Sequence, residues 1–176
     1  MNKPVTGTAQ GGERSGASGA IHASALVLGE AGVLIRGPSG SGKSSLTLAL
    51  LALAGDRGLF AALIGDDRVL IRASGRQILA SGAPSVQGLI ERRGYGIVRA
   101  VVEPCAVVRL VVDLSPRNGR GPRLPDEDAL SVSFGEISLP RLAFDAASAP
   151  VERAYAVLEY LDRIGDKIVS GIAHFA

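Results

Sequence analysis

The stretch VLIRGPSGSGKSSLTLALLALAG, residues 33–55, decides the fold, because an apolar run, a glycine cluster and a Leu- and Ala-rich run follow one another in it. Residues 33–35 predict a buried strand, and residues 44–54 predict a helix closed by Gly55 as its C-cap. Between them, residues 37–44 fit the pattern G-x-x-x-x-G-K-[ST] in the strand-to-helix context that this pattern requires. Such a loop turns backbone N–H groups toward phosphate oxygens, so the sequence predicts binding of ATP or GTP.

All eight residues of this phosphate loop are predicted to contact the nucleotide: Gly37, Pro38, Ser39, Gly40, Ser41, Gly42, Lys43 and Ser44. Lys43 adds a positive charge at the β- and γ-phosphates, and the hydroxyl of Ser44 is a suitable Mg²⁺ ligand. A glycine-rich turn that merely joins strand to helix is the alternative. The spacing and the context together favour the phosphate site.

Four further residues carry candidate chemistry, and each has a structural alternative. Asp66 and Asp67 follow an apolar strand predicted over residues 61–64, so one carboxylate is placed to hold Mg²⁺ and the other to accept a proton. A surface turn in which Asp67 pairs with Arg68 is the alternative. His22 alone is more often a surface or core histidine than a catalytic one, and Glu91 is equally consistent with a solvated charge beside Arg92.

Length and composition set the class of protein. The 176 residues favour one domain, and 47% hydrophobic residues supply a core, which rules out wholesale disorder. The net charge is 19 − 17 = +2, no basic stripe occurs, and aromatic residues make up only 4% with no Trp. A stacking platform for nucleic acid is therefore not expected.

Several features predict a cytoplasmic protein that does not enter a membrane. The single cysteine, Cys105, cannot form an intrachain disulfide, and no signal peptide is apparent. The apolar runs at residues 46–54 and 107–114 are shorter than the roughly 20 residues that cross a bilayer. Residues 1–19 are polar and glycine-rich, which predicts a flexible tail before a domain over residues 20–176.

The remaining pattern predicts an α/β domain. Residues 25–28 and 33–35 are expected to form a hairpin or two adjacent strands, and the strand, loop, helix, strand order of residues 33–64 is of the βαβ type. The other expected elements are a hairpin at 69–72 and 77–79, a short helix opened by Pro84 that ends near Arg93, strands at 97–102 and 107–113, and a helix at 151–163. The strand at 107–113 is nearly all apolar and so is expected to be central. The loop at 115–128 is long enough to suggest a functional segment.

Four motifs occur in order along the chain: Ile21-His22-Ala23, the phosphate loop, Gly65-Asp66-Asp67-Arg68-Val69, and Ile90-Glu91-Arg92-Arg93-Gly94-Tyr95-Gly96-Ile97. In this order they resemble the catalytic domain of HPr kinase/phosphorylase, a bacterial enzyme that phosphorylates a serine of the phosphocarrier protein HPr. The resemblance covers roughly residues 21–140. It implies a P-loop kinase domain of the HPr kinase/phosphoenolpyruvate carboxykinase-like type, a mixed β-sheet with flanking helices.

The resemblance also implies roles for individual residues. The family's catalytic His falls on His22, its nucleotide-binding Lys on Lys43, its proton acceptor on Asp66 and its two Mg²⁺ ligands on Ser44 and Glu91. Its catalytic Arg falls on Arg123, in the long loop. Further candidates are Asp67, Arg92 and Gly94. ATP and Mg²⁺ are the implied cofactors, and HPr is the implied partner. The resemblance also implies a homo-oligomer, specifically a hexamer.

Two departures from the family qualify this picture. The chain has no room for the additional N-terminal domain of longer members, so it resembles the short form with only the catalytic domain. The segment that the family links to dephosphorylation has its nearest counterpart in residues 139–145, which keep little of it. Kinase activity is therefore better supported than phosphorylase activity.

Two other classes of protein remain open at this point. A P-loop small-molecule kinase would use Arg117, Arg120 and Arg123 in a lid over a compact acceptor. A nucleotide-sensing regulator would bind ATP without phosphotransfer. The serine kinase is favoured because it gives both Asp66 and Glu91 a task, whereas a sensor needs no base.

Overall fold

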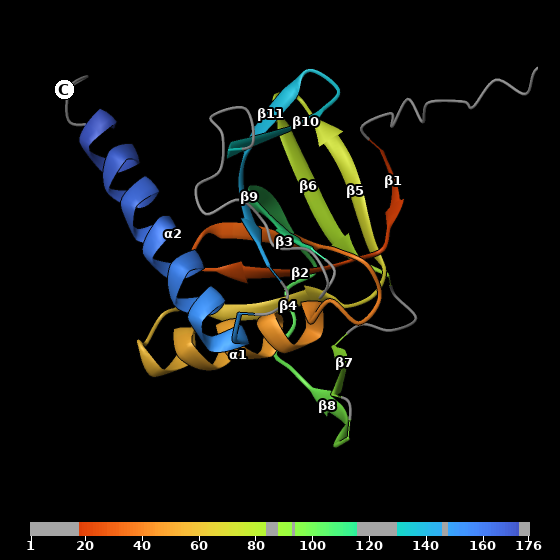
Figure 1. Cartoon of the computed structure of the whole chain (residues 1–176). Coiled ribbons are helices and arrows are strands. Elements are labelled where there is room, and N and C mark those ends of the chain that lie inside the picture. The colour runs from red at the N-terminus through yellow and green to blue at the C-terminus, as the bar shows by residue number, and fades with distance from the viewer. Residues whose placement is uncertain (1–17, 84–87, 93, 116–129, 146–147, 173–176) are drawn as a thin grey trace, which may run out of the picture.

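The computed structural model describes residues 18–83, 88–92, 94–115, 130–145 and 148–172. Within these residues the chain forms a large curled sheet, a separate hairpin and two helices (Figure 1). The strands of the large sheet are β1 (Ser18–Ile21), β2 (Ala23–Leu28), β3 (Ala31–Arg36), β4 (Ala61–Gly65), β5 (Val69–Ser74), β6 (Gln77–Gly82), β9 (Cys105–Leu114), β10 (Ser131–Phe134) and β11 (Ile137–Phe144). The predicted tail at 1–19 lies almost wholly outside the described residues.

The order of the large sheet is β1-β5-β6-β9-β3-β2-β4, with β11 also on β9 and β10 on β11. The apolar strand β9 is central, as the sequence predicted. Its first residues pair antiparallel with β6, its later residues pair parallel with β11, and its other edge pairs parallel with β3. Because β9 has different partners along its length, the sheet curls rather than staying flat.

The core lies on both faces of this sheet. All six residues of β2 are buried, which explains why this strand reads as continuously apolar apart from Ser24. Ala25 and Val27 belong to the cluster enclosed by the curled sheet, whereas Leu26 and Leu28 belong to the cluster beneath the helices. The two helices thus cover one face, and the sheet itself closes over the other.

The two helices are α1 (Lys43–Asp56) and α2 (Pro150–Ile172). Both were predicted, but both extend further than predicted. Gly55 lies inside α1 rather than at its C-cap, which is Arg57, followed by Gly58 with φ 69°. In α2 the predicted apolar stripe is buried at Ala154, Val157 and Leu158. None of the described helical residues forms a segment long and apolar enough to cross a bilayer.

Strand directions explain how the functional motifs meet. Strand β2 is antiparallel to both β3 and β4, so β3 and β4 run in the same direction on either side of it. In the register, Ala23 lies opposite Arg36 of β3, and Ala25 lies opposite Gly65 of β4. The carboxyl ends of β3 and β4 therefore flank the amino end of β2. This arrangement brings the phosphate loop, the aspartate pair and His22 to one edge of the sheet.

The helix predicted from Pro84 to about Arg93 is wrong over the described residues. Leu89–Arg92 forms β7, which pairs antiparallel with β8 (Gly96–Arg99), while residues 84–87 and Arg93 lie outside the described part. The chain reverses at Gly94 and Gly96, with φ 77° and 117°. These conformations suit glycine and a tight turn, and they are incompatible with continuing a helix.

Candidate active site

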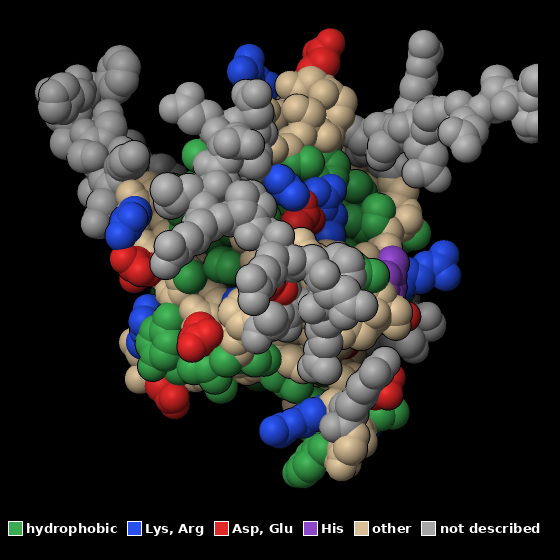
Figure 2. Space-filling model, in the orientation of Figure 1, with side chains coloured by type: hydrophobic (Ala, Val, Ile, Leu, Met, Phe, Trp, Pro, Cys, Tyr) green, Lys and Arg blue, Asp and Glu red, His purple; other side chains and the backbone are tan. Residues whose placement is uncertain are grey.

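A cleft of about 490 Å³ lies between the phosphate loop, the end of β4 and the β7–β8 hairpin. The phosphate loop and the start of α1 form one wall, the end of β4 forms the floor with His22, and the β7–β8 hairpin forms the other wall. The lining residues are His22, Ser39, Gly40, Gly42, Lys43, Ser44, Ser45, Asp66, Asp67, Leu89, Glu91, Arg92 and Ile97. Figure 2 shows positive and negative side chains interspersed over one face of the molecule, without a basic stripe.

The backbone of the phosphate loop requires glycine at its two ends. At Gly37, φ is 151°, and a Cβ atom would lie 2.6 Å from the carbonyl oxygen of Leu114 in β9. At Gly42, the N-cap of α1, φ is 96°, and its carbonyl accepts a 2.9 Å hydrogen bond from the N–H of Leu46. The loop therefore packs tightly against the sheet at one end and turns directly into the helix at the other.

Lys43 points back into the loop. Its Nζ atom donates to the carbonyl oxygens of Gly37 at 3.0 Å and Pro38 at 3.2 Å, and it lies 2.9 Å from Nε2 of His22. Lys43 is only 6% exposed. Burial lowers the pKa of its ammonium group, an effect that the nearby carboxylates of Asp67 and Asp66 oppose. The phosphate loop thus holds its cation with carbonyl oxygens, which phosphate oxygens can replace.

His22 connects Lys43 to Asp67. Its Nδ1 atom lies 2.9 Å from the carboxylate oxygen Oδ1 of Asp67. When Nε2 accepts a hydrogen bond from Nζ of Lys43, Nδ1 carries the ring hydrogen and donates a hydrogen bond to Asp67. Asp67 has φ 68°, in the left-handed region that a residue other than glycine adopts infrequently. This backbone conformation belongs to the turn that follows β4 at the cleft.

Asp66 is the buried member of the aspartate pair, with 7% exposure against the exposed Asp67. The hydroxyl of Ser24, which is fully buried in β2, donates a hydrogen bond to Oδ1 of Asp66. The backbone carbonyl of Asp66 accepts from the N–H of Arg68 at 2.9 Å, which fixes the turn. The carboxylate of Asp66 is thereby held in one orientation at the floor of the cleft.

Ser24 was missed by the sequence analysis, although a signal was present. It is a single hydroxyl residue in the apolar strand Ala23–Leu28, two positions after His22. A polar side chain that is buried in such a strand needs a hydrogen-bond partner. The adjacent strand β4, which leads into Asp66, supplies that partner.

Glu91 and Ser44 face the same cleft from opposite walls. Glu91 lies on β7 and Ser44 in the first turn of α1, so a carboxylate and a hydroxyl oxygen line one space. These are the oxygen donors that Mg²⁺ prefers, and Mg²⁺ commonly completes its coordination with water and substrate phosphates. Within the described ranges, no three His, Cys, Asp or Glu residues form a metal cluster. The residues present fit Mg²⁺ as a partner of a bound nucleotide.

The remaining predicted site residues fall in different places. Arg92 lines the cleft, and its guanidinium carbon lies 5.2 Å from the ring centre of Tyr95 at the tip of the hairpin. Gly94 lies at that tip, in a second hollow on the hairpin. Arg123, like Arg117 and Arg120, lies outside the described residues.

A strand, a glycine-rich loop and a helix, with paired carboxylates after a second strand that runs in the same direction, define the class of P-loop nucleotide-binding domains. The family model for the HPr serine kinase C-terminal domain matches residues 15–116. The chain belongs to this family. Family membership implies use of a nucleotide, which agrees with the phosphate loop.

Individual relatives agree with this membership. An HPr kinase/phosphorylase of Limosilactobacillus reuteri is 32% identical over 134 residues, which are 76% of this chain and 36% of that protein. An HPr kinase/phosphorylase of Exiguobacterium sp. is 41% identical over 80 residues, 45% of this chain and 24% of that protein. The chain thus spans about a quarter to a third of the length of these curated relatives.

A solved structure shares the fold. The Hpr(Ser) kinase/phosphatase from Coxiella burnetii matches with a TM-score of 0.65 and 25% sequence identity, over 84% of this chain and 99% of that chain. The expected α/β fold, a mixed sheet with flanking helices of the HPr kinase type, is therefore confirmed.

Proposed function

We propose that this protein is a serine kinase that uses MgATP to phosphorylate the phosphocarrier protein HPr. The observation that carries the proposal is the position of Asp66, a carboxylate held by Ser24 in the same cleft as the phosphate loop and Lys43. The names of the relatives, HPr kinase/phosphorylase, support HPr as the acceptor. The proposed reaction takes place in the cytoplasm, in line with the single exposed cysteine.

The phosphate loop and the facing hairpin hold the nucleotide in this proposal. Backbone N–H groups of the loop and the N-terminus of α1 face the phosphates, and Ser44 and Glu91 hold Mg²⁺. When bound, Mg²⁺ neutralises charge on the β- and γ-phosphate oxygens. Lys43 leaves the carbonyl oxygens of Gly37 and Pro38 and binds phosphate oxygens instead. Arg123 is proposed as a further cation at the transferred group.

Asp66 is the proposed proton acceptor. It takes the proton of the acceptor serine hydroxyl while the serine oxygen forms its bond to the γ-phosphorus and the bond from that phosphorus to the ADP oxygen breaks. Ser24 keeps the carboxylate aimed at the cleft. His22 and Asp67 hold Lys43 near the transferred group, because the contacts Lys43–His22 and His22–Asp67 are both 2.9 Å.

The decisive experiment measures transfer from labelled ATP to purified HPr, to HPr without its acceptor serine, and to sugars and nucleosides. The variant Asp66→Asn keeps the size of the side chain and removes the base, so we expect transfer to fall about 10²–10⁴-fold while ATP binding is nearly unchanged. Asp162→Asn, at a side chain 72% exposed on α2, is the matched control. Transfer by Asp66→Asn at the control's rate would refute the role of Asp66, and faster transfer to a sugar or nucleoside would refute HPr as the acceptor.

Self-association is part of the same proposal. The family resemblance implies a homo-oligomer, and apolar side chains on the surface supply material for contacts between copies. Phe60 is 54% exposed and Val101 is 69% exposed. The molar mass in solution, measured by light scattering, tests it.

A further inference from the structure

The first turn of α2 places a buried guanidinium group behind the phosphate loop. Arg153 is only 3% exposed, although it belongs to a helix whose opposite face is open to solvent. Its Nη1 atom lies 3.5 Å from the position that a Cβ atom on Gly42 would occupy. The helices hold this arrangement, because Ala154 and Val157 of α2 share one buried cluster with Leu46 of α1.

Main-chain contacts fix the orientation of this guanidinium. The carbonyl oxygen of Ser148 accepts a 3.0 Å hydrogen bond from Nε of Arg153 and a second one from Nη2. Ser148 is itself anchored, since its N–H and its hydroxyl both donate to the carbonyl of Asp145, at 3.2 and 2.7 Å. The end of β11 and the start of α2 therefore hold Arg153 toward the loop.

The residue that Arg153 approaches is the junction of the phosphate loop and α1. Gly42 is the N-cap of α1, and no side chain caps it. The first turn of α1 also contains no acidic residue. A guanidinium group is charged at every ordinary pH, and a buried charge is screened less than an exposed one. Its positive potential adds to that of the helix N-terminus at the place where phosphate groups are expected to bind.

We propose that Arg153 is a positioning residue of the phosphate site, which strengthens the binding of phosphate groups through its buried charge and through its packing on Gly42. The inference rests on the proposed function, because it requires a nucleotide on the loop. Arg153 does not line the cleft, so it acts through the loop and through the electrostatic potential rather than by touching the substrate.

The number of phosphate groups on the ligand separates this role from a merely structural one. In calorimetric titrations of the full chain, we expect Arg153→Gln to weaken the binding of ATP about tenfold and that of AMP about twofold or less, since the Coulomb energy scales with ligand charge. Arg153→Lys keeps the charge and is expected to bind ATP within about threefold of the unmodified protein.

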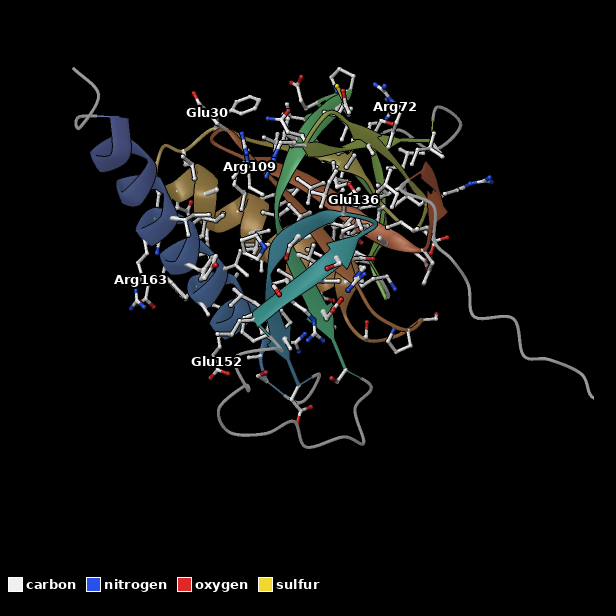
Figure 3. The ribbon with its side chains drawn as sticks, turned by 90° about the horizontal axis from the view of Figure 1, so that it is seen from above. Glu30, Arg72, Arg109, Glu136, Glu152 and Arg163 are labelled. Carbon is white, nitrogen blue, oxygen red and sulfur yellow. The ribbon has the colours of Figure 1, made fainter. Side chains whose placement is uncertain are left out.

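Arg163→Gln is the matched control on the same helix. Arg163 is 73% exposed, pairs with Glu159 at 2.6 Å, and points outward from α2 (Figure 3). Arg163→Gln removes the same charge far from the loop, so ATP and AMP are both expected to bind as they do to the unmodified protein. Thermal unfolding of each variant, followed by circular dichroism, checks that the helix pair is intact.

Each outcome decides between the proposals. Unchanged ATP affinity in Arg153→Gln, or an equal loss for ATP and AMP, overturns the role of Arg153. If Arg153→Gln does not fold, the lysine variant decides: a tenfold loss of ATP binding in a folded Arg153→Lys also overturns it. Failure of the unmodified protein to bind any nucleotide refutes the proposed function instead, before Arg153 is tested.

Discussion

Two charged clusters lie at the ends of neighbouring strands, and they differ in how their cations are held. In the first, Arg36 donates from Nε and Nη2 to both carboxylate oxygens of Asp113, at 2.7 and 2.8 Å, and Arg141 donates to one of them at 2.6 Å. In the second, Lys43 contacts two carbonyl oxygens and His22. One cluster holds two cations on one carboxylate, and the other holds its cation on carbonyl oxygens and an imidazole ring.

The Arg36–Asp113–Arg141 cluster joins three parallel strands. Arg36 ends β3 opposite Asp113 of β9, and Arg141 lies in β11 beside that part of β9. Burial alone would raise the pKa of Asp113, but the hydrogen bonds and charges of Arg36 and Arg141 outweigh it and lower the pKa. The guanidinium of Arg36 also lies over the ring of Phe134 of β10, at 5.6 Å.

The difference separates a cluster expected to stabilise the fold from one that we propose binds a ligand. In the first cluster, the bidentate contact from Arg36 and the further contact from Arg141 engage both carboxylate oxygens of Asp113 within the fold. By contrast, Nζ of Lys43 contacts carbonyl oxygens and His22, and burial lowers the pKa of its ammonium group against the opposing effect of Asp67 and Asp66. Substitutions in the two clusters are therefore expected to have opposite profiles, one on stability and one on phosphotransfer.

The largest expected effect comes from Lys43→Met, which keeps the length of the side chain and removes its charge. We expect transfer to HPr to fall at least about a hundredfold, because the variant loses the charge that offsets the phosphoryl oxygens. The free energy of unfolding should not fall, since burial already disfavours the ammonium group. Transfer assays and urea unfolding measure the two quantities, and a large loss of stability would contradict the division between the clusters.

Asp113→Asn is expected to show the reverse profile. The variant leaves Arg36 and Arg141 close together without their carboxylate, so the free energy of unfolding should fall by about 2 kcal/mol. This loss is smaller than that for a fully buried ion pair, because the three side chains are 20–30% exposed. Urea unfolding measures it, with Asp162→Asn as the control. Asp162 is exposed and 3.8 Å from Arg57, so its loss should cost less than about 1 kcal/mol.

Local rules explain which parts of the fold were predictable. The phosphate loop was predicted because positive φ angles at Gly40 and Gly42 favour glycine at those positions, which leaves a recognisable sequence pattern. The order β3, α1, β4 was predicted because each element has its own period of apolar residues. The position of His22 between the loop and Asp67 follows from strand directions, which no local sequence pattern reveals.

Long-range contacts explain which parts were missed. Strands β10 and β11 were not predicted, since β11 depends on parallel pairing with β9 and on the contact of Arg141 with Asp113. Strand β7 was predicted as part of a helix because Leu89 and Ile90 precede a charged run, which suits either structure, whereas β8 overlaps the strand predicted over residues 97–102. Sequence spacing reveals neither the hydrogen bond of Ser24 to Asp66 nor the proximity of Arg153 to Gly42, because each joins segments that lie far apart in the chain.

The smallest expected effect is the dependence of stability on acid pH, and it tests the same cluster without removing it. The folded pKa of Asp113 lies below its unfolded value of about 3.9, so the folded state binds the proton less readily. The stabilisation is therefore complete above the unfolded pKa and is lost as the pH falls through the folded pKa. Urea unfolding at pH 7 and at pH 3 should show the difference between the unmodified protein and Asp113→Asn narrowing at pH 3. An equal difference at both pH values would mean that the cluster acts through packing rather than charge, and the contrast with Lys43 would then no longer be electrostatic.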